Sequence, residues 1–168
     1  MNMKSIMALN VITVERENIR SICMINEYEL AYRLASKAHK GQKDKGGEDY
    51  FKHPLTVSNK LSGDKEKVVA LLHDVVEDTD VTVNDLKEAG FSDEVVSAVS
   101  TITKKAGEDY EEYLNRVKQN PIALRVKIAD MEHNSDISRI PNPTEKDLNR
   151  LEKYKIRLRE LREVLETR

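Results

Sequence analysis

The sequence has little of several residue types, and each scarcity excludes a class of protein. Its one cysteine, Cys23, can form neither an internal disulfide nor a cysteine-rich metal site, and it fits the reducing cytoplasm, where we expect the protein to reside. The chain has no tryptophan, and only 5% of its residues are aromatic, so stacking platforms for single-stranded nucleic acid are not expected. No apolar run approaches the roughly 20 residues that a membrane-spanning helix requires.

Charge of one sign is also lacking. The 28 Lys and Arg residues nearly balance the 30 Asp and Glu residues, and the net charge of -2 predicts no general attraction to nucleic acid or to anionic membranes. A length of 168 residues with 39% hydrophobic and 35% charged residues is typical of one soluble globular domain. Residues 1–25 carry mixed signals and predict an extension of uncertain order, whereas 26–168 predict a single domain. The oligomeric state stays open.

Helical spacing of apolar residues dominates the chain, and strand signals are nearly absent, which predicts an all-α fold. The glycines and prolines fall between the periodic segments. Asn26, Asp109 and Asn120, the last followed by Pro121, are typical first residues of helices. We expect helices over residues 27–40, 55–62, 65–78, 83–89, 93–104, 110–119, 122–139 and 144–168, with a loop over 41–49.

The expected helix over residues 65–78 is apolar nearly all round and should be the buried centre of the fold. His73 and Asp74 interrupt it, and a buried aspartate is costly unless it is paired or bound to a cation. Glu77 and Asp78 follow His73 and Asp74 at a spacing of four residues, which is about one helical turn. That spacing would hold acid–base groups close to a metal-activated water.

Two further segments can complete such a site. The expected helix over 122–139 carries Asp130 after an aliphatic approach, and His53 closes a loop just before Pro54. Two imidazoles and two carboxylates make a mixed nitrogen and oxygen donor set, which suits Mn²⁺, Fe²⁺, Mg²⁺ or Zn²⁺ better than copper. A buried His–Asp pair without metal is the alternative interpretation of His73 and Asp74.

Taken together, these motifs resemble the HD-domain superfamily, in particular the alarmone hydrolase domain of the RelA/SpoT homologues. The resemblance covers about residues 27–139 and is carried by AHKGQKDKGGEDY (38–50), His53-Pro54, LLHDVVEDT (71–79) and ADMEHN (129–134). It implies an HD-domain helical bundle with a metal site between helices. The implied ligands are His53, His73, Asp74 and Asp130, with Mn²⁺ the usual ion.

The resemblance also implies a metal-dependent nucleotide phosphohydrolase, and foremost a (p)ppGpp 3′-pyrophosphohydrolase of the kind that acts in the stringent response. Glu77 and Asp78 would then activate the attacking water. Lys45 and Asn134 match positions that contact the nucleotide in that family. The implied partner is a small nucleotide substrate, with no nucleic acid and no membrane.

Three positions depart from the family's pattern. Asp44 stands where alarmone hydrolases typically carry a basic residue, Asp49 replaces a usual Pro, and Ile137 stands where a small hydroxyl residue is common. An aspartate cannot stack on a purine base as an arginine can. Two alternatives therefore stay open: an HD phosphohydrolase of another nucleotide (a 5′-nucleotide, a nucleoside triphosphate or NADPH) and a non-catalytic HD-fold binding module. We expect His133 to fix its helix or a carboxylate beside the metal.

Overall fold

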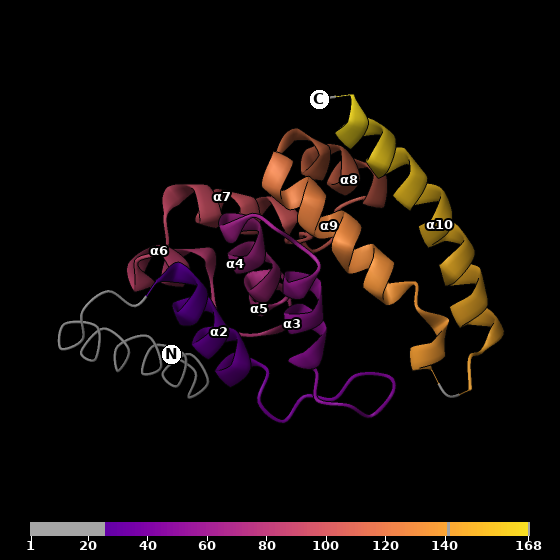
Figure 1. Cartoon of the computed structure of the whole chain (residues 1–168), viewed down its shortest axis with the longest axis horizontal. Helices are drawn as coiled ribbons and strands as arrows, with labels where there is room; N and C mark the ends of the chain where they lie inside the picture. Colours follow the sequence, from indigo (N-terminus) through magenta and orange to yellow (C-terminus); the bar gives the residue numbers. More distant parts are fainter. Residues whose placement is uncertain (1–25, 141, 168) are drawn as a thin grey trace.

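The computed structural model describes residues 26–140 and 142–167, and over these ranges it consists of helices and loops (Figure 1). The helices are α2 (Glu27–Ala38), α3 (Lys52–Asn59), α4 (Asp64–Leu72), α5 (Val75–Asp78), α6 (Val83–Ala89), α7 (Asp93–Ile102), α8 (Tyr110–Gln119), α9 (Pro121–Asn134), the 3₁₀ helix η1 (Ile137–Arg139) and α10 (Glu145–Glu166). The predicted all-α class is confirmed. The expected extension over 1–25, with Cys23, lies outside the described residues.

The helices begin where the sequence supplies capping side chains. Asn26, Asp109 and Asn120 each accept hydrogen bonds from backbone N–H groups in the first turn of α2, α8 and α9. Such bonds satisfy donors that the first turn of a helix leaves without a partner. α6 ends at Gly90, whose φ of 100° is a left-handed conformation that a side chain would strain. The predicted helix beginnings at these caps are confirmed.

The prediction of one helix over residues 65–78 is wrong, because the chain turns at His73 and Asp74 between α4 and α5. Nδ1 of His73 lies 2.6 Å from the Ala70 carbonyl oxygen, which a continuous helix would offer to the N–H of Asp74. This contact between a side chain and the backbone competes with the helix. α5 begins anew, with the N–H of Asp78 donating to the Asp74 carbonyl at 2.8 Å.

Other boundaries also differ from the prediction, and two of them lie beside the candidate site. α3 begins at Lys52, so His53 lies in the first turn of a helix and not in a loop, and Pro54 is tolerated there because early helical N–H groups need no partner within the helix. α9 ends at Asn134, and the expected continuation to residue 139 is replaced by a turn and η1. The side chain of Asp136 accepts from the N–H of Ser138 and holds this turn.

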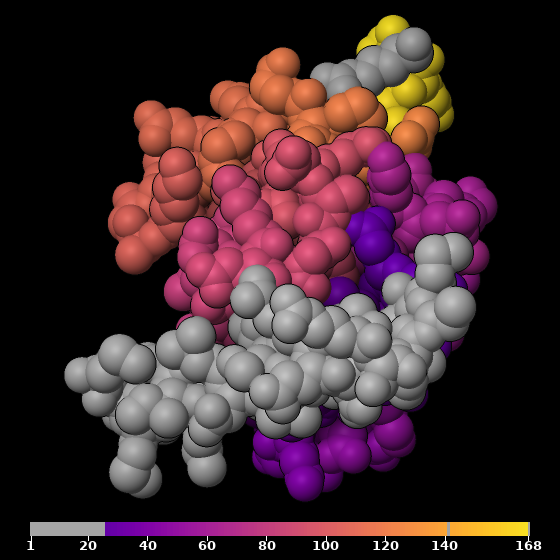
Figure 2. All heavy atoms as spheres, turned by 90° about the vertical axis from the view of Figure 1, so that its left-hand side faces the viewer, coloured from indigo at the N-terminus to yellow at the C-terminus, as the bar shows by residue number. Residues whose placement is uncertain are grey.

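α4 forms the centre of the fold. It packs against α2, α3, α7 and α9, and its residues Val68–Leu72 are all buried. α10 lies along α9 at one side of the molecule (Figure 1). Figure 2 shows the face on which α6 and α7, in pink, occupy the middle. Among the described residues, no helix combines the length and apolar character needed to cross a membrane.

Candidate metal centre

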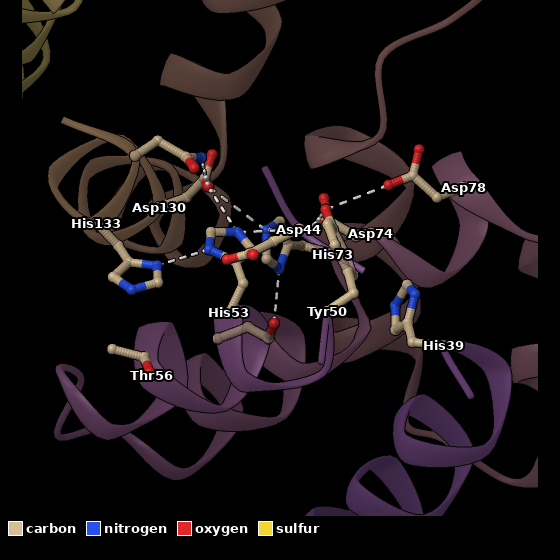
Figure 3. A network of polar contacts seen from close by, with 12 residues as sticks. His39, Asp44, Tyr50, His53, Thr56, His73, Asp74, Asp78, Asp130 and His133 are labelled. Carbon is tan, nitrogen blue, oxygen red and sulfur yellow. Dashed lines mark hydrogen bonds and ion pairs between the residues drawn. The ribbon is translucent and has the colours of Figure 1, made fainter. Parts of the chain in front are cut away.

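The ends of three helices bring two imidazoles and two carboxylates together. α3 carries His53, the turn after α4 carries His73 and Asp74, and α9 carries Asp130. The Nε2 atom of His53 lies 3.1 Å from Oδ1 of Asp130 and 3.5 Å from Oδ2 of Asp74. The Nε2 atom of His73 lies 3.2 Å from Oδ2 of Asp74 and 3.7 Å from Oδ1 of Asp130. Figure 3 shows the four side chains converging.

Three of these residues, His53, His73 and Asp130, form a buried cluster whose donor atoms lie within 4.8 Å of one another and could hold a metal ion. Asp74 borders this cluster through its contacts with both histidines. The structure thus brings together all four residues that the sequence predicts as ligands. Their assignment as a ligand set stays a prediction.

The donor set fits a cation. Nε2 of His73 is buried and makes no hydrogen bond, although carboxylate oxygens of Asp74 and Asp130 lie nearby. The Nδ1 atom of the same ring faces the Ala70 carbonyl at 2.6 Å, so it carries the proton and leaves the Nε2 lone pair directed at those oxygens. Lone pairs that face one another repel unless a proton or a metal ion lies between them.

When no metal is bound, a proton on His73 separates its Nε2 atom from the carboxylate oxygens. Burial lowers the pKa of His73, but the nearby Asp74 and Asp130 carboxylates outweigh it and raise that pKa to about 9. Burial raises the pKa of Asp130, but Lys127 and the two histidines hold it well below its usual range. The metal-free site is therefore held together by a protonated imidazole between two carboxylates, in the place that a cation would take.

Asp130 is oriented by two further side chains of α9. Nζ of Lys127 lies 2.9 Å from its Oδ2, and Nδ2 of Asn134 donates to its Oδ1 at 2.6 Å. The side chain of Lys127 is 16% exposed, and its ammonium also lies over the ring of Tyr113. Burial lowers the pKa of Lys127, but Asp130 raises it well above its usual range, so the lysine is charged. Lys127 thus neutralises one oxygen of Asp130.

Tyr50 links Asp74 to the second acidic pair. Its hydroxyl donates to Oδ2 of Asp74 at 2.7 Å and lies 3.3 Å from Oδ2 of Asp78 (Figure 3). Burial, followed by the charge of Asp74, raises the pKa of Asp78. Glu77, by contrast, accepts a hydrogen bond from the backbone N–H of Lys104 at 3.1 Å. Because the chain turns before α5, the expected stacking of Glu77 over His73 in one continuous helix is not observed.

The two predicted nucleotide contacts lie in different places. Asn134 is beside the metal cluster through its bond to Asp130. Nζ of Lys45 pairs instead with Oδ1 of Asp147 at 3.0 Å, at the beginning of α10, and its side chain is 61% exposed. Asp44 pairs with Arg139 at 2.8 Å, so its charge is compensated.

Sequence reasoning did not single out Lys127 and Arg139, and it named Tyr50 only as part of a motif, without a role. His133, expected to fix its helix or a carboxylate, contacts the imidazole of His53. Lys127 alone left a signal, because it is a lysine three positions before Asp130, a spacing at which helical side chains can pair. The other contacts join residues far apart in the chain, and periodicity gives no indication of them.

The sequence profile of the family described as HD domain matches residues 31–126. A guanosine-3′,5′-bis(diphosphate) 3′-pyrophosphohydrolase of Aquifex aeolicus is 35% identical over 116 residues, which are 62% of this chain and 16% of that protein. A GTP pyrophosphokinase of Streptomyces coelicolor is 37% identical over 123 residues, 66% of this chain and 14% of that protein. The bifunctional (p)ppGpp synthase/hydrolase SpoT of Escherichia coli is 32% identical over 124 residues, 66% of this chain and 18% of that protein.

This chain therefore spans about a sixth of the length of these relatives. A solved structure, that of a metazoan orthologue of SpoT that hydrolyses ppGpp, aligns with a TM-score of 0.67 at 23% identity. The alignment covers 86% of this chain and 88% of that one, which shows a shared fold.

Proposed function

This chain belongs to the HD-domain family, and on that premise we propose that it is a metal-dependent phosphohydrolase that removes the 3′-diphosphate of a (p)ppGpp-like nucleotide. The observation that carries the proposal is the convergence of His53, His73, Asp74 and Asp130, with the Nε2 atom of His73 buried, without a hydrogen-bond partner and facing both carboxylates. The activities named for the relatives of Aquifex aeolicus and Escherichia coli support the substrate class.

In this proposal the four residues hold one divalent ion, with Mn²⁺ preferred and Fe²⁺, Mg²⁺ or Zn²⁺ as alternatives. Such an ion supplies Lewis-acid polarisation of a phosphoryl oxygen and a more acidic water. Asp78 takes the proton of the attacking water, since Tyr50 holds its carboxylate beside Asp74 and its raised pKa suits a proton acceptor. Glu77, whose carboxylate accepts a hydrogen bond from the backbone N–H of Lys104, orients the same water.

Nucleotide binding is assigned to Asn134 and Lys45. Asn134 already donates to Asp130 and can direct its remaining amide hydrogen to a substrate oxygen. Lys45, whose side chain is 61% exposed, would exchange Asp147 for a phosphate, and Asp147 would keep its hydrogen bonds to Thr144. The reaction breaks the bond between the 3′ oxygen and the phosphorus that water attacks, and it releases pyrophosphate.

A Mn²⁺-supplemented panel of ppGpp, 5′-nucleotides, nucleoside triphosphates and NADPH tests the proposal. We expect pyrophosphate from ppGpp and no turnover by Asp74→Ala. Asp78→Asn and Glu77→Gln should lose activity while retaining metal, whereas Glu112→Gln, the same change on the exposed face of α8, should match wild type. Free phosphate from another nucleotide would make that nucleotide the substrate. The panel includes these alternatives because Asp44 stands where alarmone hydrolases typically carry a basic residue. Tight binding without turnover would make the domain a binding module.

A further inference from the structure

The loop over residues 42–50 is bonded to the candidate ligands from both of its ends. At one end Tyr50 donates to Asp74. At the other end Oδ2 of Asp44 accepts from Nη2 of Arg139 at 2.8 Å. Nη1 of Arg139 lies 3.3 Å from Nδ1 of His133, and that nitrogen lies 2.6 Å from Nδ1 of His53. Asp44, Arg139 and His133 thus form a chain of contacts that leads to His53.

Nη1 of Arg139 also donates to the carbonyl oxygen of His133 at 3.3 Å, and one order of protons lets it donate to the ring as well. A guanidinium can only donate hydrogen bonds, so Nδ1 of His133 has to accept. An accepting nitrogen carries no proton, and the proton between the two imidazoles therefore belongs to Nδ1 of His53. An imidazole protonated at Nδ1 has its lone pair on Nε2. Nε2 of His53 is the atom that faces Asp74 and Asp130 (Figure 3).

We propose that Arg139, anchored by Asp44 and acting through His133, is a positioning residue that sets the tautomer in which His53 can bind a metal ion. The inference rests on the metal site proposed above and adds groups that do not reach the ion themselves. A hydrogen bond to the outer nitrogen of a metal-binding histidine fixes the ring and its tautomer, and losing it typically weakens metal binding about 10- to 100-fold.

The surroundings of Asp44 support an anchoring role. Its Oδ1 accepts from the backbone N–H groups of Gly46 and Glu48, both at 2.9 Å, while its Oδ2 accepts from Arg139. A Cβ on Gly46 would come within 2.8 Å of the Arg139 carbonyl oxygen, so the loop lies directly against this residue. The acidic residue that departs from the family's pattern is therefore the partner that holds Arg139 in place.

The test measures the Mn²⁺ affinity of chelator-stripped full-length protein by titration calorimetry, with the absorption spectrum of the Co²⁺-loaded protein as a second readout of the ligand set. Arg139→Met removes the donor, and Arg139→Lys keeps one. The charge-swapped Asp44→Arg/Arg139→Asp double variant restores an ion pair but presents an acceptor to His133. That acceptor would draw the His133 proton to Nδ1 and reverse the order of protons at His53.

We expect Arg139→Met and the swapped variant to bind Mn²⁺ about 10- to 100-fold more weakly, with a changed Co²⁺ spectrum, and Arg139→Lys to stay near wild type. His133→Asn, which keeps an acceptor near the position of Nδ1, should retain affinity that His133→Phe loses. Arg125→Met is the matched control, because it removes an arginine of α9 whose ion pair, with Glu66 of α4, lies outside this chain of contacts. Thermal unfolding without metal identifies any variant that fails to fold.

Wild-type affinity in Arg139→Met, or its recovery in the swapped variant, would overturn the inference, because Arg139 would then only dock the loop. This outcome differs from failure of the proposed function, in which the wild-type protein itself would bind no Mn²⁺. If His133→Phe does not fold, the Arg139 variants decide the question alone. We expect them to fold, because the side chain of Arg139 is 27% exposed and methionine or lysine can replace its aliphatic part.

Discussion

Replacing Asp130 by asparagine tests the electrostatics of the site in the absence of metal. Asp130→Asn keeps the shape of the side chain but leaves Lys127 without its carboxylate partner. The two side chains are 7% and 16% exposed, and their charged atoms lie 2.9 Å apart. Breaking a buried ion pair by removing one partner costs about 3–5 kcal/mol, because the other charge is left uncompensated. At about 2–4 °C per kcal/mol, the Tm of the metal-free protein should fall by about 6–20 °C.

Urea and thermal unfolding of chelator-treated protein measure this loss. The double variant Lys127→Met/Asp130→Asn should be more stable than Asp130→Asn alone, since methionine retains the apolar stem without the charge. Glu94→Gln, which breaks the exposed pair with Lys65, should cost less than about 1 kcal/mol and is the control. The reasoning is refuted if the free energy of unfolding of Asp130→Asn lies within about 1 kcal/mol of the wild-type value. It is also refuted if the losses measured for Asp130→Asn and for Lys127→Met add up to the loss of the double variant.

Three further predictions concern the same region. Burial lowers the pKa of His73, but Asp74 and Asp130 raise it to about 9. Metal binding near pH 7 should therefore release close to one proton from this ring, and calorimetry in two buffers of different ionisation enthalpy measures that proton. In the metal-free protein this raised pKa stabilises the fold below the unfolded value of about 6.5, and that stabilisation should be lost as the pH rises towards 9; a Tm that rises instead contradicts the assignment. Tyr50→Phe removes the donor to Asp74 and should weaken Mn²⁺ binding about 10-fold or more, and unchanged affinity would exclude this role. Lys45→Ala should change the free energy of unfolding by less than about 1 kcal/mol while raising KM for the nucleotide, so an unchanged KM would remove Lys45 from the substrate contacts.

Local chemistry made most helix beginnings predictable. Asn26, Asp109 and Asn120 each supply a side-chain acceptor where a first turn lacks one, and the structure places them as caps. The meeting of His73, Asp74 and Asp130 was also predictable, since polar residues that can bind metal are costly in apolar helices unless they meet a partner. His53, expected in a loop, was joined to them by the donor set and by the resemblance to the HD-domain superfamily. These features depend on neighbours in the sequence or on a chemical need that few arrangements satisfy.

The break at His73 was not predictable from apolar periodicity. Periodicity registers which residues are buried, and every residue from Val68 to Val75 except Asp74 is buried in the structure whether or not the helix continues. At this point the His73 ring contacts the Ala70 carbonyl, and periodicity gives no indication of such a contact. The same limit applies to Arg139, whose partner Asp44 lies 95 residues away and is held by loop geometry that a single sequence does not encode in any pattern.

The two oxygens of Asp130 have separate partners, and this division decides the charge of the site. Oδ2 faces Lys127, whereas Oδ1 faces His53 and receives the amide of Asn134. Without metal, Lys127 offsets one of the two carboxylates. The protonated ring of His73 offsets the other carboxylate. A divalent ion that displaces this proton would therefore turn the summed charge of Asp74, Asp130, Lys127 and His73 from neutral to positive. A net positive centre favours a phosphate anion over a neutral ester. Lys127 would thus contribute to the proposed preference for phosphorylated substrates by offsetting one carboxylate of the site.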